Sequence, residues 1–103
     1  MTGQLHPAAA LDDTVHQRAR LGILAILCAV AEADVASLKS ELGLTDGNLG
    51  RHLQVLADAG LVSTQRHLDG ARPRTTVKAT DIGVKAFRDE VALLRALIDR
   101  APR

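Results

Sequence analysis

The sequence predicts one mainly α-helical domain that carries a single small β-hairpin. Its 103 residues, of which 47% are hydrophobic and 24% charged, match the size and composition of one globular domain. Phe87 is the only Phe, Tyr or Trp, and a core built mostly from leucine and alanine favours helices over a β-sandwich. Helical spacing of apolar residues is interrupted by strand-like segments only between residues 61 and 80.

The N-terminal third is expected to hold a loose arm followed by two helices. Residues 1–10 show no hydrophobic period and are predicted to form the arm. Asp12 or Asp13 can cap a short first helix, and the segment 20–31 (RLGILAILCAVA) predicts a second helix that is apolar on nearly all sides. The rest of the domain must cover such a helix over most of its surface.

Two further helices are predicted on either side of a very short turn. The first spans residues 35–42, with Asp34 as a candidate N-cap and Gly43 as its C-terminal stop. The second follows the N-cap Thr45 and ends at Gly60. Its buried stripe has i, i+4, i+7 spacing and consists of Leu49, Leu53 and Leu56, which leaves Asn48, Arg51 and Gln54 facing outward. Two helices joined so tightly predict a helix-turn-helix.

A β-hairpin is predicted next, with strands at residues 61–67 and 74–79. Asp69, Gly70 and Pro73 lie between the strands and are typical turn residues.

Positive charge is concentrated at this hairpin, although the net charge of the chain is only +1. Residues 1–60 hold four basic and seven acidic residues, a net charge of −3, whereas residues 61–103 hold nine basic and five acidic residues, a net charge of +4. Within residues 66–78, Asp69 is the one acid beside Arg66, Arg72, Arg74 and Lys78. A local basic cluster favours a polyanionic partner.

Thr80 is expected to cap a long C-terminal helix over residues 81–99. Apolar residues follow a 3-4-3-4 spacing along it, at Val84, Phe87, Val91, Leu94 and Ile98. We expect a homodimer through this helix, joined by the N-terminal helices, with contacts from Phe87, Val91, Leu94 and Ile98. The alternative is that the stripe packs inside its own domain.

Several other classes of protein are disfavoured. Cys28 is the only cysteine, which excludes an internal disulfide and a multi-cysteine zinc site and makes the cytoplasm the expected location. The longest uncharged stretch, residues 21–31, is 11 residues long, well short of the roughly 20 that span a membrane. The same stretch resembles a signal peptide, with Ala29-Val30-Ala31 as cleavage site, but its removal would delete the most hydrophobic helix.

No cofactor, metal or catalytic site is expected. The histidines are scattered without an i, i+4 pair and are interpreted as solvated or capping residues: His6, His16, His52 and His67. Cys28 is interpreted as a small buried residue whose apolar neighbours raise its pKa, with a redox switch as the alternative. The sequence shows no nucleophile-base set, carboxylate pair or phosphate-binding loop, so an enzyme is not expected.

The helix-turn-helix carries a family resemblance. From residue 38 to residue 62 the chain reads LKSELGLTDGNLGRHLQVLADAGLV, which resembles the ArsR and MarR families of bacterial transcriptional regulators. The piece HLQVLADAGLV is similar to the end of their recognition helix and the start of their wing. The stretch GLTDGNL, followed by a wing with Gly70, Arg72, Pro73, Arg74 and Thr75, resembles the small stand-alone winged-helix proteins of that group.

This resemblance covers residues 12–98 and implies a winged helix-turn-helix with a long C-terminal helix. Residues 35–60 would then form the helix-turn-helix, residues 61–80 the wing and residues 81–100 the dimerisation helix. Metal-sensing ArsR members have a paired-cysteine motif on the helix before the turn. Here that helix reads VASLKSEL without cysteine, which disfavours a metal sensor of that type.

The helix after the turn is expected to enter the major groove of double-stranded DNA with its N-terminal part. This places six residues at or near DNA, namely Thr45, Asp46, Gly47, Asn48, Arg51 and His52. Arg51 can pair with guanine and Asn48 with adenine, and these two are the predicted base-reading residues.

Each of the other four positions on this helix has two possible interpretations. Thr45 can cap the helix and reach a phosphate, and Gly47 either lets the backbone approach DNA or is merely tolerated. Asp46 is interpreted first as a partner of the helix dipole and second as an acceptor from cytosine. His52 is expected to be half-buried, as a packing or phosphate contact rather than a base contact.

At the wing, Arg66, Arg72 and Arg74 are expected to lie against the DNA backbone or minor groove, with a merely solvated hairpin tip as the alternative. The sequence therefore predicts a homodimeric transcriptional regulator, with repression as the favoured mode, that reads a near-palindromic operator. A winged helix used for protein–protein interaction is the second hypothesis. A small-molecule effector in the dimer cleft is left open.

Overall fold

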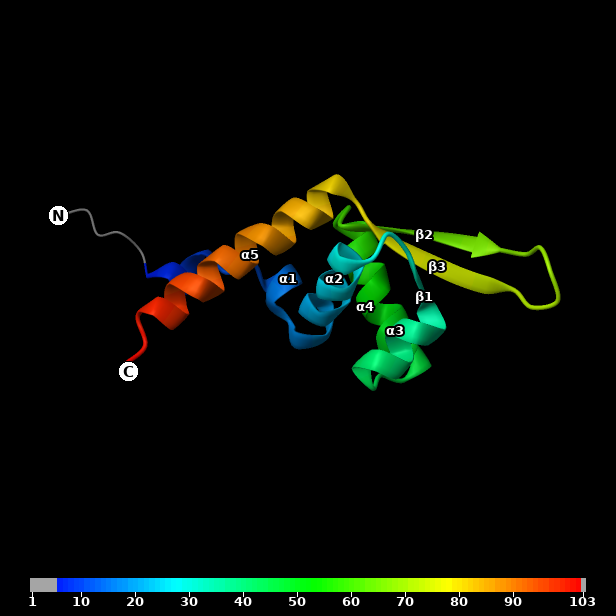
Figure 1. Cartoon of the computed structure of the whole chain (residues 1–103), viewed down its shortest axis with the longest axis horizontal. Coiled ribbons are helices and arrows are strands. Elements are labelled where there is room, and N and C mark those ends of the chain that lie inside the picture. The colour runs from blue at the N-terminus through cyan, green and yellow to red at the C-terminus, as the bar shows by residue number, and fades with distance from the viewer. Residues whose placement is uncertain (1–5, 103) are drawn as a thin grey trace.

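The computed structural model describes residues 6–102, except for the side chain of His16, and confirms a mainly helical fold with a small sheet (Figure 1). The elements in chain order are η1 (Pro7–Ala10), α1 (Asp13–His16), α2 (Arg18–Ala29), β1 (Ala33–Asp34), α3 (Val35–Leu42), α4 (Asp46–Asp58), β2 (Val62–His67), β3 (Arg74–Ala79) and α5 (Asp81–Asp99).

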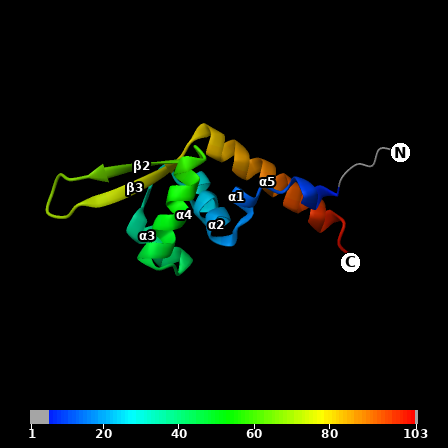
Figure 2. The same cartoon turned by 180° about the vertical axis from the view of Figure 1, so that it is seen from behind.

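The molecule is elongated, with extents of 63 × 27 × 23 Å. The hairpin of β2 and β3 projects from one end, and the C-terminal part of α5 lies at the other end beside η1 (Figures 1 and 2). Helices α2, α3 and α4 form the body between them. The hairpin and the free part of α5 are therefore well separated.

The helix-turn-helix has the predicted form. Helix α3 ends at Gly43, which adopts a left-handed conformation with φ of 62°, and the amide of Leu44 closes the end by donating to the carbonyl of Lys39 at 3.1 Å. Helix α4 begins after Thr45, whose Oγ1 accepts a hydrogen bond from the amide of Asn48 at 3.2 Å. The opposite end is closed at Gly60, with φ of 77°.

The structure corrects the predicted second helix. It spans Arg18–Ala29 instead of residues 20–31, because Gln17 caps it: the Oε1 atom accepts from the amides of Ala19 at 2.9 Å and Arg20 at 3.2 Å. Eight of its twelve residues are buried or half-buried, as expected for a helix covered on most sides, although Cys28 is exposed.

A short strand, β1, was not predicted and makes the sheet three-stranded in the order β1-β3-β2. Ala33 pairs with Val77, and Asp34 pairs with Thr76. Asp34 occupies the predicted N-cap position of α3, but its side chain makes no capping hydrogen bond. Its backbone instead continues the sheet up to the first residue of α3.

The core lies between the helices of the body and the inner face of the sheet. Its fully buried apolar side chains come from α1, α2, α3, α4 and β3 and include Val15, Ile23, Leu24, Leu38, Leu49, Leu56 and Val77. Burial of each such side chain contributes about 1.5–3 kcal/mol. The leucine stripe of α4 is part of this core, with Leu53 also buried, so the opposite face of α4 is free.

Helix α5 is fixed to the body at its first turn. Thr80 Oγ1 accepts from the amide of Gly83 at 3.0 Å, as predicted for a cap, and donates to the carbonyl of Gly60 at 2.6 Å. Gly83 touches the backbone of Leu61 so closely that a Cβ atom there would overlap the Leu61 carbonyl. Only glycine fits this contact without a shift of α5.

The N-terminal segment packs along α5, which corrects part of the predicted arm. Pro7–Ala10 form a 3-10 helix in contact with α5, while residues 1–5 of the predicted arm lie outside the described residues. The amide of Asp12 donates to Glu90 Oε1 at 3.1 Å, and Glu90 is only 1% exposed.

The apolar stripe of α5 is divided between two environments. Phe87 packs against the core of its own domain, as in the alternative interpretation. Val91 and Leu94 are half-buried, whereas Ile98 is 70% exposed. The outer half of the stripe is thus available for a partner.

Candidate nucleic-acid interface

The exposed face of α4 carries the predicted base-reading residues. Asn48 and Arg51 are both exposed and lie one helical turn apart. Arg51 Nη2 donates to Asn48 Oδ1 at 3.0 Å, so the two side chains are aligned on the same face. Because Thr45 caps the helix beneath them, the N-terminal turn of α4 is held in place where it would meet DNA.

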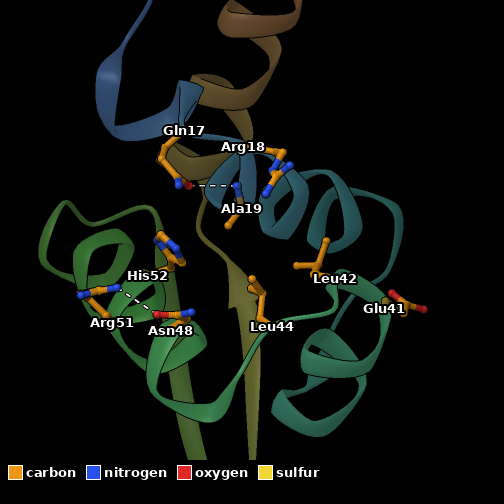
Figure 3. A pocket seen from close by; sticks show the side chains of 9 residues that line it. All are labelled: Gln17, Arg18, Ala19, Glu41, Leu42, Leu44, Asn48, Arg51 and His52. Atoms are coloured by element: carbon orange, nitrogen blue, oxygen red, sulfur yellow. Dashed lines mark hydrogen bonds between the residues drawn. The ribbon is translucent and has the colours of Figure 1, made fainter.

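A cleft of about 620 Å³ borders this face on the side of α2 (Figure 3). Its walls come from the start of α2, the end of α3, the turn and α4, and its lining residues are Gln17, Arg18, Ala19, Glu41, Leu42, Leu44, Asn48, Arg51 and His52. Arg18 and Arg51 bring two exposed guanidinium groups to the cleft against the single carboxylate of Glu41. The cleft is thus polar and carries net positive charge.

His52 is half-buried beside this cleft, as expected. Its Nδ1 atom accepts a hydrogen bond from Arg20 Nε at 3.4 Å. Burial lowers the pKa of His52, and the charges of Arg20 and Arg51 lower this pKa further. The imidazole is therefore neutral at pH 7 and serves as an acceptor within the protein.

Asp46 forms an ion pair with Lys39 of α3, with 3.0 Å between Oδ1 and Nζ. The carboxylate is in the first turn of α4, where the helix dipole stabilises it. This environment agrees with the first interpretation of Asp46. Gly47, the next residue, is exposed and has open space around its Cα.

A second, smaller hollow of about 290 Å³ lies on the other side of α4, toward the wing. Its lining residues come from α3, α4 and the two long strands, and they are Val35, Gly50, Leu53, Gln54, Ala57, Thr64 and Thr75. Gln54 is exposed and donates to Asp58 Oδ1 at 2.8 Å. The free face of α4 is thus a ridge between two hollows.

This arrangement adds two polar residues to the predicted set. Gln54 follows Arg51 by three residues, so helical periodicity marks it as outward-facing and could have included it. Arg18 joins the cleft from a segment 30 positions before Asn48. No local pattern connects Arg18 to the recognition helix, so only the fold reveals it.

The wing carries Arg66, Arg72 and Arg74, and all three are exposed. The strands pair in register, with His67 opposite Arg74, and Gly70 at the tip has a left-handed φ of 93°. None of the three arginines forms an ion pair with another residue in the described range 6–102. The hairpin extends away from the body (Figures 1 and 2), and none of these three arginines lines the cleft beside α4.

His6 and His67 form hydrogen bonds within the protein, and Cys28 lies at the surface. His6 caps η1 by accepting from the amide of Ala8, and His67 is hydrogen-bonded to the buried Thr76 at 2.9 Å. The side chain of His16 lies outside the described residues. The interpretation of Cys28 as buried is wrong, but partial desolvation still raises the pKa of its thiol, while Arg88 opposes this shift.

Among the described residues, no three His, Cys, Asp or Glu side chains gather as metal ligands would. Within the same part of the chain, every helix is too short or too polar to cross a lipid bilayer.

Comparison with known proteins gives consistent matches. Residues 19–98 match the family model of the winged helix DNA-binding domain. The uncharacterized protein MJ0432 of Methanocaldococcus jannaschii is 38% identical over 72 residues, which cover 70% of this chain and 78% of that protein.

Two solved structures are similar. A transcriptional regulator homologue from Pyrococcus horikoshii OT3 is 36% identical, with a TM-score of 0.79 over 84% of this chain and 85% of that one. The YusO protein from Bacillus subtilis shares the fold at 17% identity, with a TM-score of 0.78 over 92% of this chain and 67% of that one.

The family model describes DNA binding and the Pyrococcus horikoshii structure a transcriptional regulator homologue, in agreement with the prediction that the chain is not an enzyme. They also confirm the predicted winged helix and the resemblance to winged-helix transcriptional regulators. The chain belongs to the winged helix DNA-binding domain family.

Proposed function

We propose that this protein is a cytoplasmic, homodimeric transcriptional regulator that binds a near-palindromic DNA operator and represses the adjacent gene. Each subunit places the N-terminal half of α4 in the major groove and lays its wing against the backbone or minor groove. The observation that carries this proposal is the exposed, capped face of α4, on which Asn48 and Arg51 are aligned by their mutual hydrogen bond.

The residues of α4 have separate roles in this proposal. Arg51 pairs with guanine and Asn48 with adenine, each pair contributing about 1–3 kcal/mol of discrimination. Thr45 and Gly47 allow close approach of the first turn to a phosphate. Asp46 and His52 support the helix through Lys39 and Arg20 and contact DNA at the margin of the interface.

The wing anchors the complex. Arg66, Arg72 and Arg74 are exposed and are not neutralised by ion pairs among the described residues, so they can release counterions from the DNA backbone. Contacts of this kind add affinity without much dependence on sequence. Arg72 precedes Pro73 on the turn and is the residue proposed for the minor groove.

The dimer forms through the outer half of α5, with Val91, Leu94 and Ile98 at the contact and the half-buried Phe87, which packs against its own core, at the inner edge. Support comes from Ile98, which is 70% exposed although it belongs to an apolar stripe. A twofold axis would present two α4 helices to half-sites about one helical turn apart. A dimer bound over a promoter excludes the polymerase by occupancy alone, which favours repression.

A small-molecule effector would act in the cleft between the helices of the dimer. The PcaV transcriptional regulator from Streptomyces coelicolor, solved with its natural ligand, shares this fold at 16% identity, with a TM-score of 0.71 over 92% of this chain and 69% of that one.

A gel-shift titration with DNA from upstream of the protein's own gene tests the proposal. We expect binding to one site that resists competition by unrelated DNA and weakens steeply as salt rises. Binding that does not distinguish this DNA from unrelated DNA would contradict it. No binding to DNA at all would favour the alternative of a protein-interaction module.

A further inference from the structure

Arg20 lies where three helices meet. It is half-buried on α2, and its Nε atom donates to Nδ1 of His52 on α4 at 3.4 Å. Its Nη1 atom donates to the carbonyl oxygen of Thr14 on α1 at 3.3 Å. One planar guanidinium therefore contacts α1 and α4 at the same time, and its fixed fork of donors restrains the angle between them.

The same contacts continue from α1 to α5. Asp12 Oδ1 accepts from the amide of Thr14 at 2.9 Å, and the amide of Asp12 donates to Glu90 Oε1 at 3.1 Å. Glu90 is buried on α5. A continuous set of hydrogen bonds thus connects His52 of the recognition helix to Glu90 of the helix proposed for dimerisation.

We propose that Arg20 is a positioning residue that fixes the orientation of α4 relative to α1 and α5 and thereby sets the half-site spacing that the dimer accepts. This inference rests on the proposed function, because a spacing is defined only when each subunit of a dimer places one α4 in DNA. Because α5 forms the dimer contact, the angle between α4 and α5 in each subunit then determines how the two α4 helices of the dimer are spaced and oriented on DNA.

Arg18 provides a matched control. It carries the same charge, lies two residues earlier on α2 and lines the cleft beside α4. Unlike Arg20, it is exposed, and its side chain forms no hydrogen bond or ion pair with another residue in the part of the chain that the structure describes. Loss of Arg18 removes only a charge near the DNA, whereas loss of Arg20 removes a charge and a connection between helices.

The test uses the full chain and three DNA duplexes. One carries the operator found by the gel-shift, and the others carry it with one base pair inserted or deleted between the half-sites, which rotates them by roughly 35° relative to each other. The wild type is expected to prefer the natural spacing. For Arg20→Gln the preference is expected to fall by roughly tenfold, which is within the range of coupling between residues in one network.

Arg18→Gln is expected to weaken binding to all three duplexes by the same factor and to reduce the salt dependence by about one phosphate contact. An Arg20→Gln protein that behaves like Arg18→Gln, or keeps the full spacing preference, would overturn the inference. Thermal unfolding of both variants establishes that they are folded.

A measurement without DNA checks the contact itself. Burial lowers the pKa of His52, and the charges of Arg20 and Arg51 lower it further, while Arg18 and Glu41 line the same cleft. In an NMR titration, Arg20→Gln should raise the pKa of His52. Arg20→Lys should keep this pKa low and still relax the spacing preference, because lysine retains the charge but not the planar fork.

An unchanged His52 pKa in Arg20→Gln would refute the contact. A wild type without preference for any operator would refute the proposed function instead, and the titration would still report whether Arg20 holds α4.

Discussion

Arg51 Nη2 donates to Asn48 Oδ1 at 3.0 Å, so the two residues proposed to read bases are bonded to each other on α4. A guanidinium has five N–H donors, and one bond to Asn48 leaves others free for a guanine edge. The bond also restrains both side chains, the long one of Arg51 above all, before DNA arrives, which reduces the conformational entropy lost on binding. The two residues are thus expected to act as a unit.

The wing arginines should contribute affinity without sequence preference. Arg72→Ala is expected to weaken binding to operator and to unrelated DNA by the same factor and to lower the salt slope by about 1. Fluorescence anisotropy at several salt concentrations measures both effects. If Arg72→Ala weakened only the operator complex, the wing would instead contribute to sequence reading.

The dimer contact is tested by two equivalent substitutions on α5. Ile98 and Ile82 are 70% and 65% exposed, but only Ile98 belongs to the apolar stripe. Ile98→Glu is expected to shift the protein toward monomers because it places a charge in the contact, whereas Ile82→Glu should remain dimeric. Sedimentation velocity distinguishes the two states. A wild type that sediments as a monomer at micromolar concentration would refute the dimer.

Two helical glycines should respond to alanine in opposite directions. Gly83→Ala is expected to reduce the free energy of unfolding by about 2–3 kcal/mol, since the methyl group would overlap the Leu61 carbonyl and displace α5. Gly50 lies on α4 and has open space where a Cβ atom would be. Gly50→Ala should therefore increase the free energy of unfolding by about 0.5–1 kcal/mol. Urea denaturation measures both values. Equal effects of the two substitutions would contradict the close contact at Gly83.

The stability of the protein should depend on His52 below neutral pH. Its folded pKa lies below the ordinary value of about 6.5, so the unfolded chain binds the proton first. The stabilisation that neutral His52 contributes is therefore fully present above a pH of about 6.5. The free energy of unfolding decreases as the pH falls from there through the folded pKa of His52.

His52→Asn offers Arg20 an acceptor but does not titrate in this range. The variant should lose part of the decline in unfolding free energy that the wild type shows on acidification. An identical pH dependence in both proteins would show that His52 is not perturbed.

The local parts of the fold could be predicted well from the sequence. Helix α3, strand β3 and helix α5 have the predicted bounds, since they are delimited by caps and turns within a few residues, such as Gly43 and Thr80. The exposed face of α4 followed in the same way from its leucine spacing. Each of these features depends on neighbours along the chain.

The predicted bounds of α2 were wrong for a local reason, the cap by Gln17, but the other errors concern contacts between distant segments. Strand β1 exists only because Ala33 meets Val77, and two residues carry no strand pattern of their own. The burial of Glu90 on α5 was not predicted, and its Oε1 atom accepts from the amide of Asp12, 78 positions earlier in the chain. The roles assigned to Arg18 and Arg20 likewise required the fold, since both residues lie outside the helix-turn-helix.

The most direct test of the central proposal is methylation of guanine N7 by dimethyl sulfate in the bound operator. Because Arg51 would occupy the O6 and N7 edge of a guanine in the major groove, the wild type should protect that guanine in each half-site. Arg51→Ala should lose this protection while Arg72→Ala keeps it. Protection that is unchanged by Arg51→Ala would show that α4 does not read the major groove as proposed.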